Sequence, residues 1–212
     1  MLLFVHGGGF LVGDKGGDGN GNGGWANAHL GRWAAANGML GAVMNYRLAP
    51  DETWPAGAED VAAAVEWLQE HAAEHGGDPE RIVLLGTSAG SVHIASFLKL
   101  RSDHAGMVRA AVLLSGLYGF TPLDERDMLY YGRQDAYAGR MPREAVVETA
   151  LPCCSLVPSS IRRASRPSGP GFCRPGWTAT AACRARTMPA ATTITRWPCT
   201  SAPPTGGFPT KF

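Results

Sequence analysis

The sequence lacks several features that would point to other classes of protein. No apolar run approaches the roughly 20 residues that a membrane-spanning helix needs, and no basic stretch precedes the apolar residues 2–5, as it would in a secretory signal. No Cys occurs before Cys153, and the five Cys include no C-x-x-C pair and have no His nearby. We therefore expect a cytoplasmic protein with no membrane partner, no disulfide framework and no zinc site.

Histidine and acidic residues are missing from the last part of the chain. No His follows His104 and no acid follows Glu148, whereas all five Cys and ten of the 15 Pro lie beyond it. The first 148 residues hold 11 basic and 18 acidic residues, a balance of −7, and the last 64 hold eight basic residues and no acid. We expect a folded core over residues 1–150 and an irregular tail, disordered or non-native, over residues 151–212.

The remaining composition is that of one globular domain. The chain has 212 residues, of which 45% are hydrophobic and 17% charged, which is enough apolar material for a packed core. The formal net charge of +1 gives no reason to expect a nucleic-acid partner. A nucleic-acid role for the basic tail, with Trp177 and Trp197 as stacking residues, is the weaker alternative, because its Arg residues are scattered.

Apolar runs alternate with helical patterns over the first 148 residues. The runs are too apolar for half-exposed strands, which favours an α/β fold with a mostly parallel sheet and helices on both faces, in three layers. Trp33 and Trp67 are expected on the buried faces of their helices. The strands are expected at residues 2–5, 40–44, 82–85 and 110–114, and the helices at 27–37, from Pro55 to about residue 75, at 89–100 and near 142–148.

The pentapeptide Gly86-Thr87-Ser88-Ala89-Gly90 stands between an expected strand and an expected helix. This is the context of a G-x-S-x-G nucleophile elbow, in which a sharp turn exposes the Ser hydroxyl at the carboxyl edge of the sheet. The glycines leave room for the turn, and the helix N-terminus favours developing negative charge. The context favours a nucleophile over a plain turn.

A second signal is the run His6–Phe10, His-Gly-Gly-Gly-Phe, directly after the first strand. Consecutive glycines allow several backbone N–H groups to point at one small volume, as an oxyanion hole requires. A flexible glycine loop is the plain alternative, and the G-x-S-x-G turn two strands later makes it the poorer interpretation.

Three segments, His6–Phe10, Asn45–Pro50 and Gly86–Gly90, together resemble the hormone-sensitive-lipase-like carboxylesterases of the α/β-hydrolase fold. The resemblance runs from about Leu2 to Gly116 and extends less closely to Glu148. It implies a partial α/β-hydrolase fold and a serine carboxylesterase-type hydrolase that acts on a small-molecule ester and needs no cofactor or metal.

The resemblance also implies roles for individual residues. Ser88 is the expected nucleophile, and the backbone N–H groups of Gly8, Gly9 and Ala89 are the expected oxyanion donors. The expected scaffold residues of the two motifs are His6, which braces the loop, Gly7, Gly86 and Gly90, and Tyr46, Arg47 and Asp60 are given scaffold roles elsewhere.

The triad that this family uses is incomplete in the sequence. A Ser nucleophile needs a His base held by an acid, and in this family both follow the fourth strand in the order Ser, acid, His. No His follows His104 and no acid follows Glu148. The sequence also leaves no room for the strands that normally precede the His-Gly-Gly-Gly strand. We therefore expect little or no activity from these 212 residues.

A shift of reading frame near Pro152 is the interpretation that we favour for the abrupt change in composition. Read from the third base of each codon, permitted codons give Val-Leu-Leu over Pro152–Ser155, Asp-Pro-Pro near Ser160 and a His near Ala191, in the order that the family requires. A true Arg-, Pro- and Thr-rich tail is the alternative. Genomic reads showing an intact open frame across codons 148–156 would exclude the shift.

Other candidate sites are weaker. The segment from Asp18 to Gly23 begins like an EF-hand loop, but its twelfth position is His29 instead of Glu, so a polar loop is favoured over a calcium site. His93, five residues beyond Ser88 on the helix that follows the turn, is turned well away from Ser88 and is expected to pack. An amidase or formamidase and a non-catalytic ligand-binding remnant remain as alternative functions, and the oligomeric state stays open.

Overall fold

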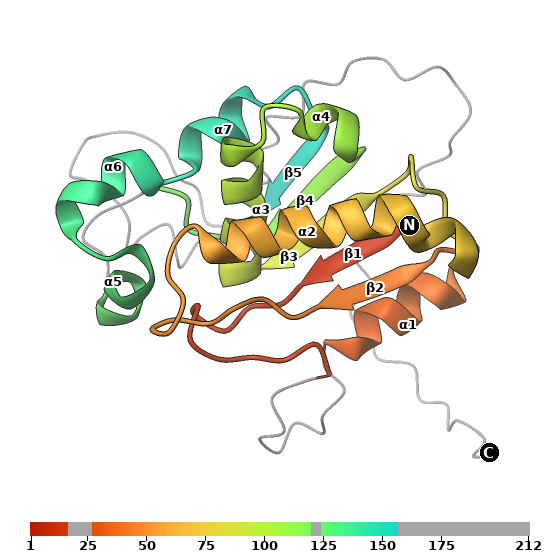
Figure 1. Cartoon of the computed structure of the whole chain (residues 1–212), viewed down its shortest axis with the longest axis horizontal. Coiled ribbons are helices and arrows are strands. Elements are labelled where there is room, and N and C mark those ends of the chain that lie inside the picture. The colour runs from red at the N-terminus through yellow and green to blue at the C-terminus, as the bar shows by residue number, and fades with distance from the viewer. Residues whose placement is uncertain (17–26, 120–123, 157–212) are drawn as a thin grey trace, which may run out of the picture.

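The protein forms an α/β fold around a five-stranded sheet (Figure 1). The computed structural model describes residues 1–16, 27–119 and 124–156. The strands lie in the order β2-β1-β3-β4-β5, and every neighbouring pair is parallel, so each connection within the described residues crosses over the sheet. The strands are β1 (Leu2–Val5), β2 (Gly41–Met44), β3 (Val83–Thr87), β4 (Ala110–Leu114) and β5 (Cys153–Leu156).

The helices include three long ones that connect the first four strands and several short ones near the end of the described chain. The predicted α/β class and the predicted helix over residues 89–100 are confirmed. The helices are α1 (Ala28–Ala36), α2 (Ala56–His71), the 3-10 turn η1 (Ala72–His75), α3 (Ala89–Leu100), α4 (His104–Met107), α5 (Glu125–Tyr131), η2 (Gln134–Ala136), α6 (Tyr137–Arg140) and α7 (Arg143–Glu148).

Helices cover both faces of the sheet, because alternate strand residues face opposite layers. On β2, a methyl group on Gly41 would meet the backbone of Gly31 in α1, so this side of the strand lies against α1. The next residues along, Ala42 and Met44, belong instead to the core on the other side, which α2 and α3 cover. The expected three layers are therefore present over β1 and β2.

The main core lies between the sheet and the pair α2 and α3. Its fully buried side chains include Leu3, Leu84 and Leu113 from three neighbouring strands and Val61 and Ile94 from the two helices. Nearly all of α3 is buried, from Ala89 to Leu98. This burial fixes the start of α3 against the carboxyl ends of β1 and β3, where both predicted motifs lie.

Two tryptophans differ from the sequence-based expectation. Trp33 on α1 is 45% exposed and Trp67 on α2 is 50% exposed, although both were expected on buried helix faces. The buried residues of α2 include Val61, Val65 and Leu68 but not Trp67. Trp67 stacks instead on the imidazole of His71, with ring centroids 4.7 Å apart, so its apolar area is covered from the side.

The sheet continues past the expected boundary of the core at residue 150. Strand β5, at Cys153–Leu156, pairs with β4 and places Cys153 opposite Ala111. The irregular tail was expected from residue 151, so the four residues of β5 differ from that expectation. The rest of the tail lies outside the described residues.

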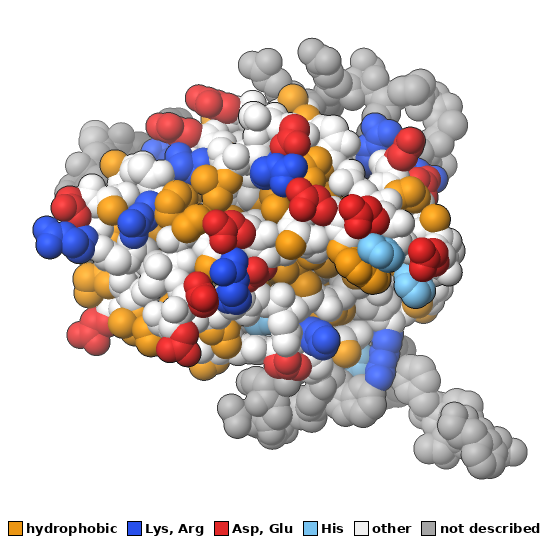
Figure 2. Space-filling model, in the orientation of Figure 1, with side chains coloured by type: hydrophobic (Ala, Val, Ile, Leu, Met, Phe, Trp, Pro, Cys, Tyr) orange, Lys and Arg blue, Asp and Glu red, His pale blue; other side chains and the backbone are white. Residues whose placement is uncertain are grey.

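The outer surface over α2 carries charges of both signs (Figure 2). Arg101 bridges Glu66 of α2 and Asp103, at 2.5 and 2.9 Å. Within the described residues, no helix is both long and apolar enough to cross a bilayer.

Candidate active site

Ser88 occupies a strained turn between β3 and α3. Its φ and ψ are 50° and −120°, a conformation that side chains other than Gly rarely adopt and that costs about 1–3 kcal/mol. The Ser88 N–H donates to the carbonyl of Leu114 at 2.8 Å, and Ser91 Oγ donates to the same oxygen at 3.0 Å. The end of β4 thus holds the turn, and the Ser88 side chain is exposed.

Two glycines make the turn possible by allowing close backbone approach. A methyl group on Gly90 would collide with the carbonyl oxygen of Val5 and lie 2.5 Å from that of His6. A methyl group on Gly86 would lie 2.7 Å from the backbone nitrogen of Ser91. These contacts supply the physical reason for both glycines of the G-x-S-x-G pattern.

The glycine loop after β1 turns back on itself. Gly8 and Gly9 have φ values of 138° and 59°, in the region that favours glycine. The N–H groups of Leu11 and Val12 both donate to the carbonyl of Gly8 at 3.2 Å. Within the described residues, the N–H groups of Gly8, Gly9 and Ala89 donate to no backbone or side-chain acceptor.

The glycine loop and the serine turn lie in contact. A methyl group on Gly7 would lie 3.2 Å from Ser88 Cβ and 3.1 Å from the carbonyl oxygen of Thr87. The two predicted motifs, about 80 residues apart in the sequence, therefore meet at the carboxyl edge of β1 and β3. This contact brings the segment His6–Gly9 and the segment Gly86–Gly90 to the same edge of the sheet.

His6 is buried beneath the glycine loop. Its ring stacks on Tyr46, with centroids 4.4 Å apart, and its Nδ1 lies 2.7 Å from the carbonyl oxygen of Gly7. The Tyr46 hydroxyl donates to the carbonyl of His6 at 3.0 Å, and burial raises its pKa. These contacts hold the His6 ring and backbone in place at the start of the glycine loop.

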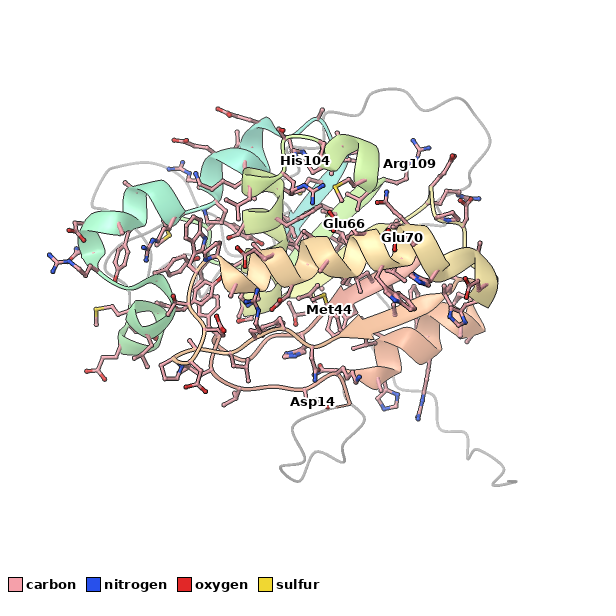
Figure 3. All side chains as sticks on the ribbon, in the orientation of Figure 1. Asp14, Met44, Glu66, Glu70, His104 and Arg109 are labelled. Carbon is pink, nitrogen blue, oxygen red and sulfur yellow. The ribbon has the colours of Figure 1, made fainter. Side chains whose placement is uncertain are left out.

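Asp14 fixes the far end of the loop to the end of β2 (Figure 3). One carboxylate oxygen accepts from the Asn45 side-chain amide at 2.8 Å, and the other accepts from the Gly16 N–H at 2.7 Å. These two hydrogen bonds, the Asn45 bond foremost, hold the pKa of Asp14 below its usual range. Asn45 also accepts from the Lys15 N–H at 2.5 Å, so one side chain holds the loop on two sides.

Arg47 and Asp60 join the segment after β2 to α2. The Asp60 carboxylate accepts from the Arg47 backbone N–H at 2.7 Å and from Arg47 Nε at 2.8 Å. The Glu59 carboxylate accepts from Arg47 Nη2 at 2.9 Å, and the backbone carbonyl of Ala56 accepts from the same nitrogen at 3.2 Å. The hydrogen bonds that Arg47 donates to the Glu59 and Asp60 carboxylates raise the pKa of Arg47.

An aromatic cluster lies on the other side of the glycine loop. The Phe10 ring, which is buried, lies parallel to that of Tyr130 on α5, with centroids 4.3 Å apart and an angle of 5°. His93 and Tyr131 contact the Phe10 ring edge-on, at 5.5 and 5.7 Å. Such aromatic pairs each contribute about 0.5–1.5 kcal/mol beyond their buried area. The cluster therefore holds Phe10 in its left-handed conformation, with φ at 70°.

His93 is fully buried in this cluster, as expected for a packing residue. Its Nδ1 lies 3.2 Å from the Tyr130 hydroxyl, and its ring fills the space left by Gly57 on α2. Burial, and to a smaller extent the charge of His6, lowers the pKa of His93 to about 3. The ring is neutral at physiological pH.

Ser88 has no partner that could take its proton within the described residues. Its hydroxyl makes no hydrogen bond there, and the cluster around His93 lies within the core. The described residues also hold no group of three or more His, Cys, Asp or Glu side chains placed for a metal ion. Residues 18–23 of the EF-hand-like segment, and the positions near Ser160 and Ala191 where a shifted frame permits Asp and His, lie outside the described residues.

A cavity lies beside α6 and α7. Its volume is about 610 Å³, and Tyr137, Met141, Arg143 and Glu144 are among the residues that line it. Ser88 is not among them, so the cavity does not open on the exposed hydroxyl.

Comparison with known proteins decides which family this architecture represents. A family model described as the alpha/beta hydrolase fold matches residues 2–155, well over half of the 212 residues. The chain belongs to the α/β-hydrolase fold family. The matched range of this α/β hydrolase contains both motifs and ends within β5.

Curated relatives of this α/β hydrolase carry esterase names, which confirms the predicted resemblance to carboxylesterases. Probable carboxylic ester hydrolase LipM of Mycobacterium tuberculosis is 33% identical over 135 residues, which make up 59% of this chain and 29% of that protein. Carboxylesterase NlhH of the same organism is 39% identical over 106 residues, 50% of this chain and 31% of that protein. The chain spans about three-tenths of the length of these two relatives.

Solved esterase structures share the architecture of this α/β hydrolase. Thermogutta terrifontis esterase 2 superposes with a TM-score of 0.57 at 22% identity, over 77% of this chain and 64% of that one. The hyperthermophilic esterase from the archaeon Pyrobaculum calidifontis gives a TM-score of 0.56 at 24% identity, over 73% of this chain and 54% of that one. At these identities the likeness shows the fold alone.

Some residues around the site were not singled out from the sequence. Ser91 Oγ donates a hydrogen bond to the carbonyl of Leu114. The ring of Tyr130 contacts Phe10 of the glycine loop, about 120 residues earlier in the chain. A buried Ser three positions after the turn gives no distinctive signal, and no local pattern links Tyr130 to Phe10.

Proposed function

We propose that this chain is a carboxylic-ester hydrolase by descent, in which Ser88 is the nucleophile. The Ser88 hydroxyl attacks the ester carbonyl carbon, and the carbonyl oxygen becomes an oxyanion that the N–H groups of Gly8, Gly9 and Ala89 stabilise. Ser88 loses its proton to solvent, the C–O bond to the alcohol breaks, and the leaving alkoxide takes up a proton and departs as the alcohol. Water then hydrolyses the acyl-Ser88 that remains, which releases the acid and restores the Ser88 hydroxyl. No cofactor or metal is needed for these steps.

The contact between Gly7 and Ser88 is the observation that carries this proposal. Gly7 of the loop whose N–H groups meet no acceptor among the described residues lies against the strained, exposed Ser88 at one edge of the sheet. The relatives named as ester hydrolases support the choice of an ester over other acyl groups. An amidase or formamidase would use the same elbow and donors, and turnover of an anilide in preference to an ester would favour that alternative.

We further propose that the 212-residue chain turns over slowly, because Ser88 has no base. The proton of the Ser88 hydroxyl must leave as the bond to carbon forms, and no His follows His104 in the sequence. In another Ser hydrolase, loss of triad members lowers kcat by roughly 10⁴- to 10⁶-fold. A ligand-binding remnant without catalysis is the alternative that the unpartnered Ser88 favours.

Chemical rescue by an external base tests both statements. We expect very slow hydrolysis of p-nitrophenyl butyrate by the unmodified chain and a faster, saturable rate when 2-methylimidazole is added as the proton acceptor. Ser88→Ala is the matched control, because the free base attacks the ester equally in its presence. A mass increase of one butyryl group on Ser88 identifies the acyl-enzyme.

Three outcomes separate the candidates. Rescue that depends on Ser88 supports the esterase proposal, and rapid turnover without added base overturns the proposed lack of a base. Saturable binding of the ester with no rescue and no acyl mass would favour the ligand-binding remnant instead.

A further inference from the structure

The buried contacts around Phe10 connect the glycine loop to a helix that is distant in sequence. Phe10 directly follows Gly9, and its carbonyl accepts from the Ala49 N–H at 2.9 Å. Its side chain, however, contacts mainly rings of α5 and α3. The Phe10 backbone is thus hydrogen-bonded to the segment that follows β2, and the Phe10 ring packs against α3 and α5.

Tyr130 is the residue that holds this ring most fully. Its ring covers the face of Phe10 at 4.3 Å, its hydroxyl lies 3.2 Å from His93 Nδ1, and its carbonyl accepts from the Trp54 N–H at 2.9 Å. The side chain is buried, and three separate elements therefore fix its position. A residue fixed in this way can hold Phe10 in one place.

We propose that Tyr130 is a positioning residue for the oxyanion loop: its ring fixes Phe10, and Phe10 fixes the direction of the Gly8 and Gly9 amides. Phe10 has φ at 70°, a left-handed conformation that residues other than Gly rarely adopt, and it directly follows Gly9, which has φ at 59°. Without the ring of Tyr130, the Phe10 side chain loses its covering face and the loop gains other conformations. This inference rests on the proposed role of the loop in binding the oxyanion.

The hydroxyl and the ring of Tyr130 have separable roles. The ring contacts Phe10, whereas the hydroxyl contacts His93, which lies on α3 behind the loop. Tyr130→Phe keeps the ring and removes the hydroxyl, so the loop should keep its conformation. Tyr130→Ala removes both. Leu129→Ala is the matched control, because Leu129 is the neighbouring residue of α5 and is 46% exposed.

Hydrogen–deuterium exchange measures the conformational stability of the glycine loop without relying on activity. The N–H groups of Leu11 and Val12 donate to Gly8, so a peptide over residues 7–12 reports whether the turn is closed. We expect this peptide to exchange at least roughly tenfold faster in Tyr130→Ala and at the original rate in Tyr130→Phe and Leu129→Ala. Peptides from β3 and β4 should stay unchanged, which shows that the sheet is intact.

Base-rescued turnover of p-nitrophenyl butyrate gives the second readout. Since oxyanion donors act on the transition state, kcat in Tyr130→Ala should fall at least roughly tenfold with KM nearly unchanged, and Tyr130→Phe should restore it. If no variant or parent shows rescue, the proposed function fails while the exchange result still decides the positioning role.

The proposal is overturned if residues 7–12 exchange equally in Tyr130→Ala and the parent while the sheet is intact. It is also overturned if Leu129→Ala opens the loop to the same extent. If Tyr130→Ala does not fold, Tyr130→Leu retains an apolar side chain without a flat ring and is judged by the same exchange criterion.

Discussion

The hydroxyl of Tyr46 donates a hydrogen bond to the backbone carbonyl of His6 over 3.0 Å. The bond joins the end of β2 to the first residue of the glycine loop, 40 positions earlier in the chain. The two rings also stack, so Tyr46 holds His6 through both its backbone and its side chain. The loop therefore begins from a fixed point.

Tyr46→Phe should destabilise the protein by about 1–3 kcal/mol, because it keeps the stacked ring but leaves the buried His6 carbonyl without this donor. The free energy of unfolding, measured in urea, is the test. Tyr131→Phe is the control, since its buried hydroxyl has no partner within the described residues and its removal should cost nothing. Equal losses in the two variants would show that the hydroxyl of Tyr46 is not the cause.

The strand and helix pattern around Ser88 could be read from the sequence because each signal there is local. A run of apolar residues, a Gly-flanked Ser and a long apolar helix define β3 and α3, and α3 has the predicted bounds of Ala89 and Leu100. The meeting of the two motifs also followed from the parallel sheet, in which the carboxyl ends of strands share one edge.

Features that depend on distant contacts could not be read in this way. Trp33 and Trp67 lie at the margins of their apolar stripes, and only the packed neighbours decide which side of the margin is exposed. Strand β5 has the sequence Cys-Cys-Ser-Leu, which is not a typical strand run, and it forms because β4 offers an edge. The stack of Phe10 on Tyr130 has no local signal.

His93 predicts a specific dependence of stability on pH. Its pKa is about 3 in the folded chain, against 6.5 for a histidine side chain in water, so the unfolded chain takes up the proton first as the pH falls. The stabilisation by neutral His93 is therefore complete above pH 6.5 and is lost progressively below it, by about 1.4 kcal/mol per pH unit.

The free energy of unfolding in urea should be measured for the parent and for His93→Leu at roughly pH 7.5, 6, 5 and 4.5. The difference between the two proteins isolates the contribution of His93. Other groups, such as Asp14 and Asp103 with their lowered pKa values, titrate in both proteins and cancel in the difference. The parent should lose stability relative to His93→Leu as the pH falls. If the difference in unfolding free energy between the parent and His93→Leu stays constant over this pH range, protonation of His93 does not destabilise the folded chain.

Asp60 is expected to matter more than the other acids around Arg47. Asp60→Ala removes acceptors from both the backbone N–H and Nε of Arg47, which should cost about 1–2 kcal/mol. Glu52→Ala is the control, because the 3.6 Å Glu52–Arg47 pair is about half exposed and should change stability by less than about 0.5 kcal/mol. Thermal unfolding of the two variants measures this difference, and a larger loss in Glu52→Ala would contradict the assigned roles.

Gly90 should tolerate no side chain, because the space for a Cβ is filled by the backbone of the neighbouring strand. A methyl group there would collide with the carbonyl oxygen of Val5, and neither β1 nor the start of α3 can move without opening the turn at Ser88. We expect Gly90→Ala to lower the free energy of unfolding by about 3 kcal/mol or more. Gly139→Ala on α6, where a methyl group meets nothing within 4 Å, should be neutral or stabilising by up to about 1 kcal/mol. Denaturant titration of the pair tests this contrast, and a Gly90→Ala chain as stable as Gly139→Ala would mean that the strand and the turn are not packed against each other.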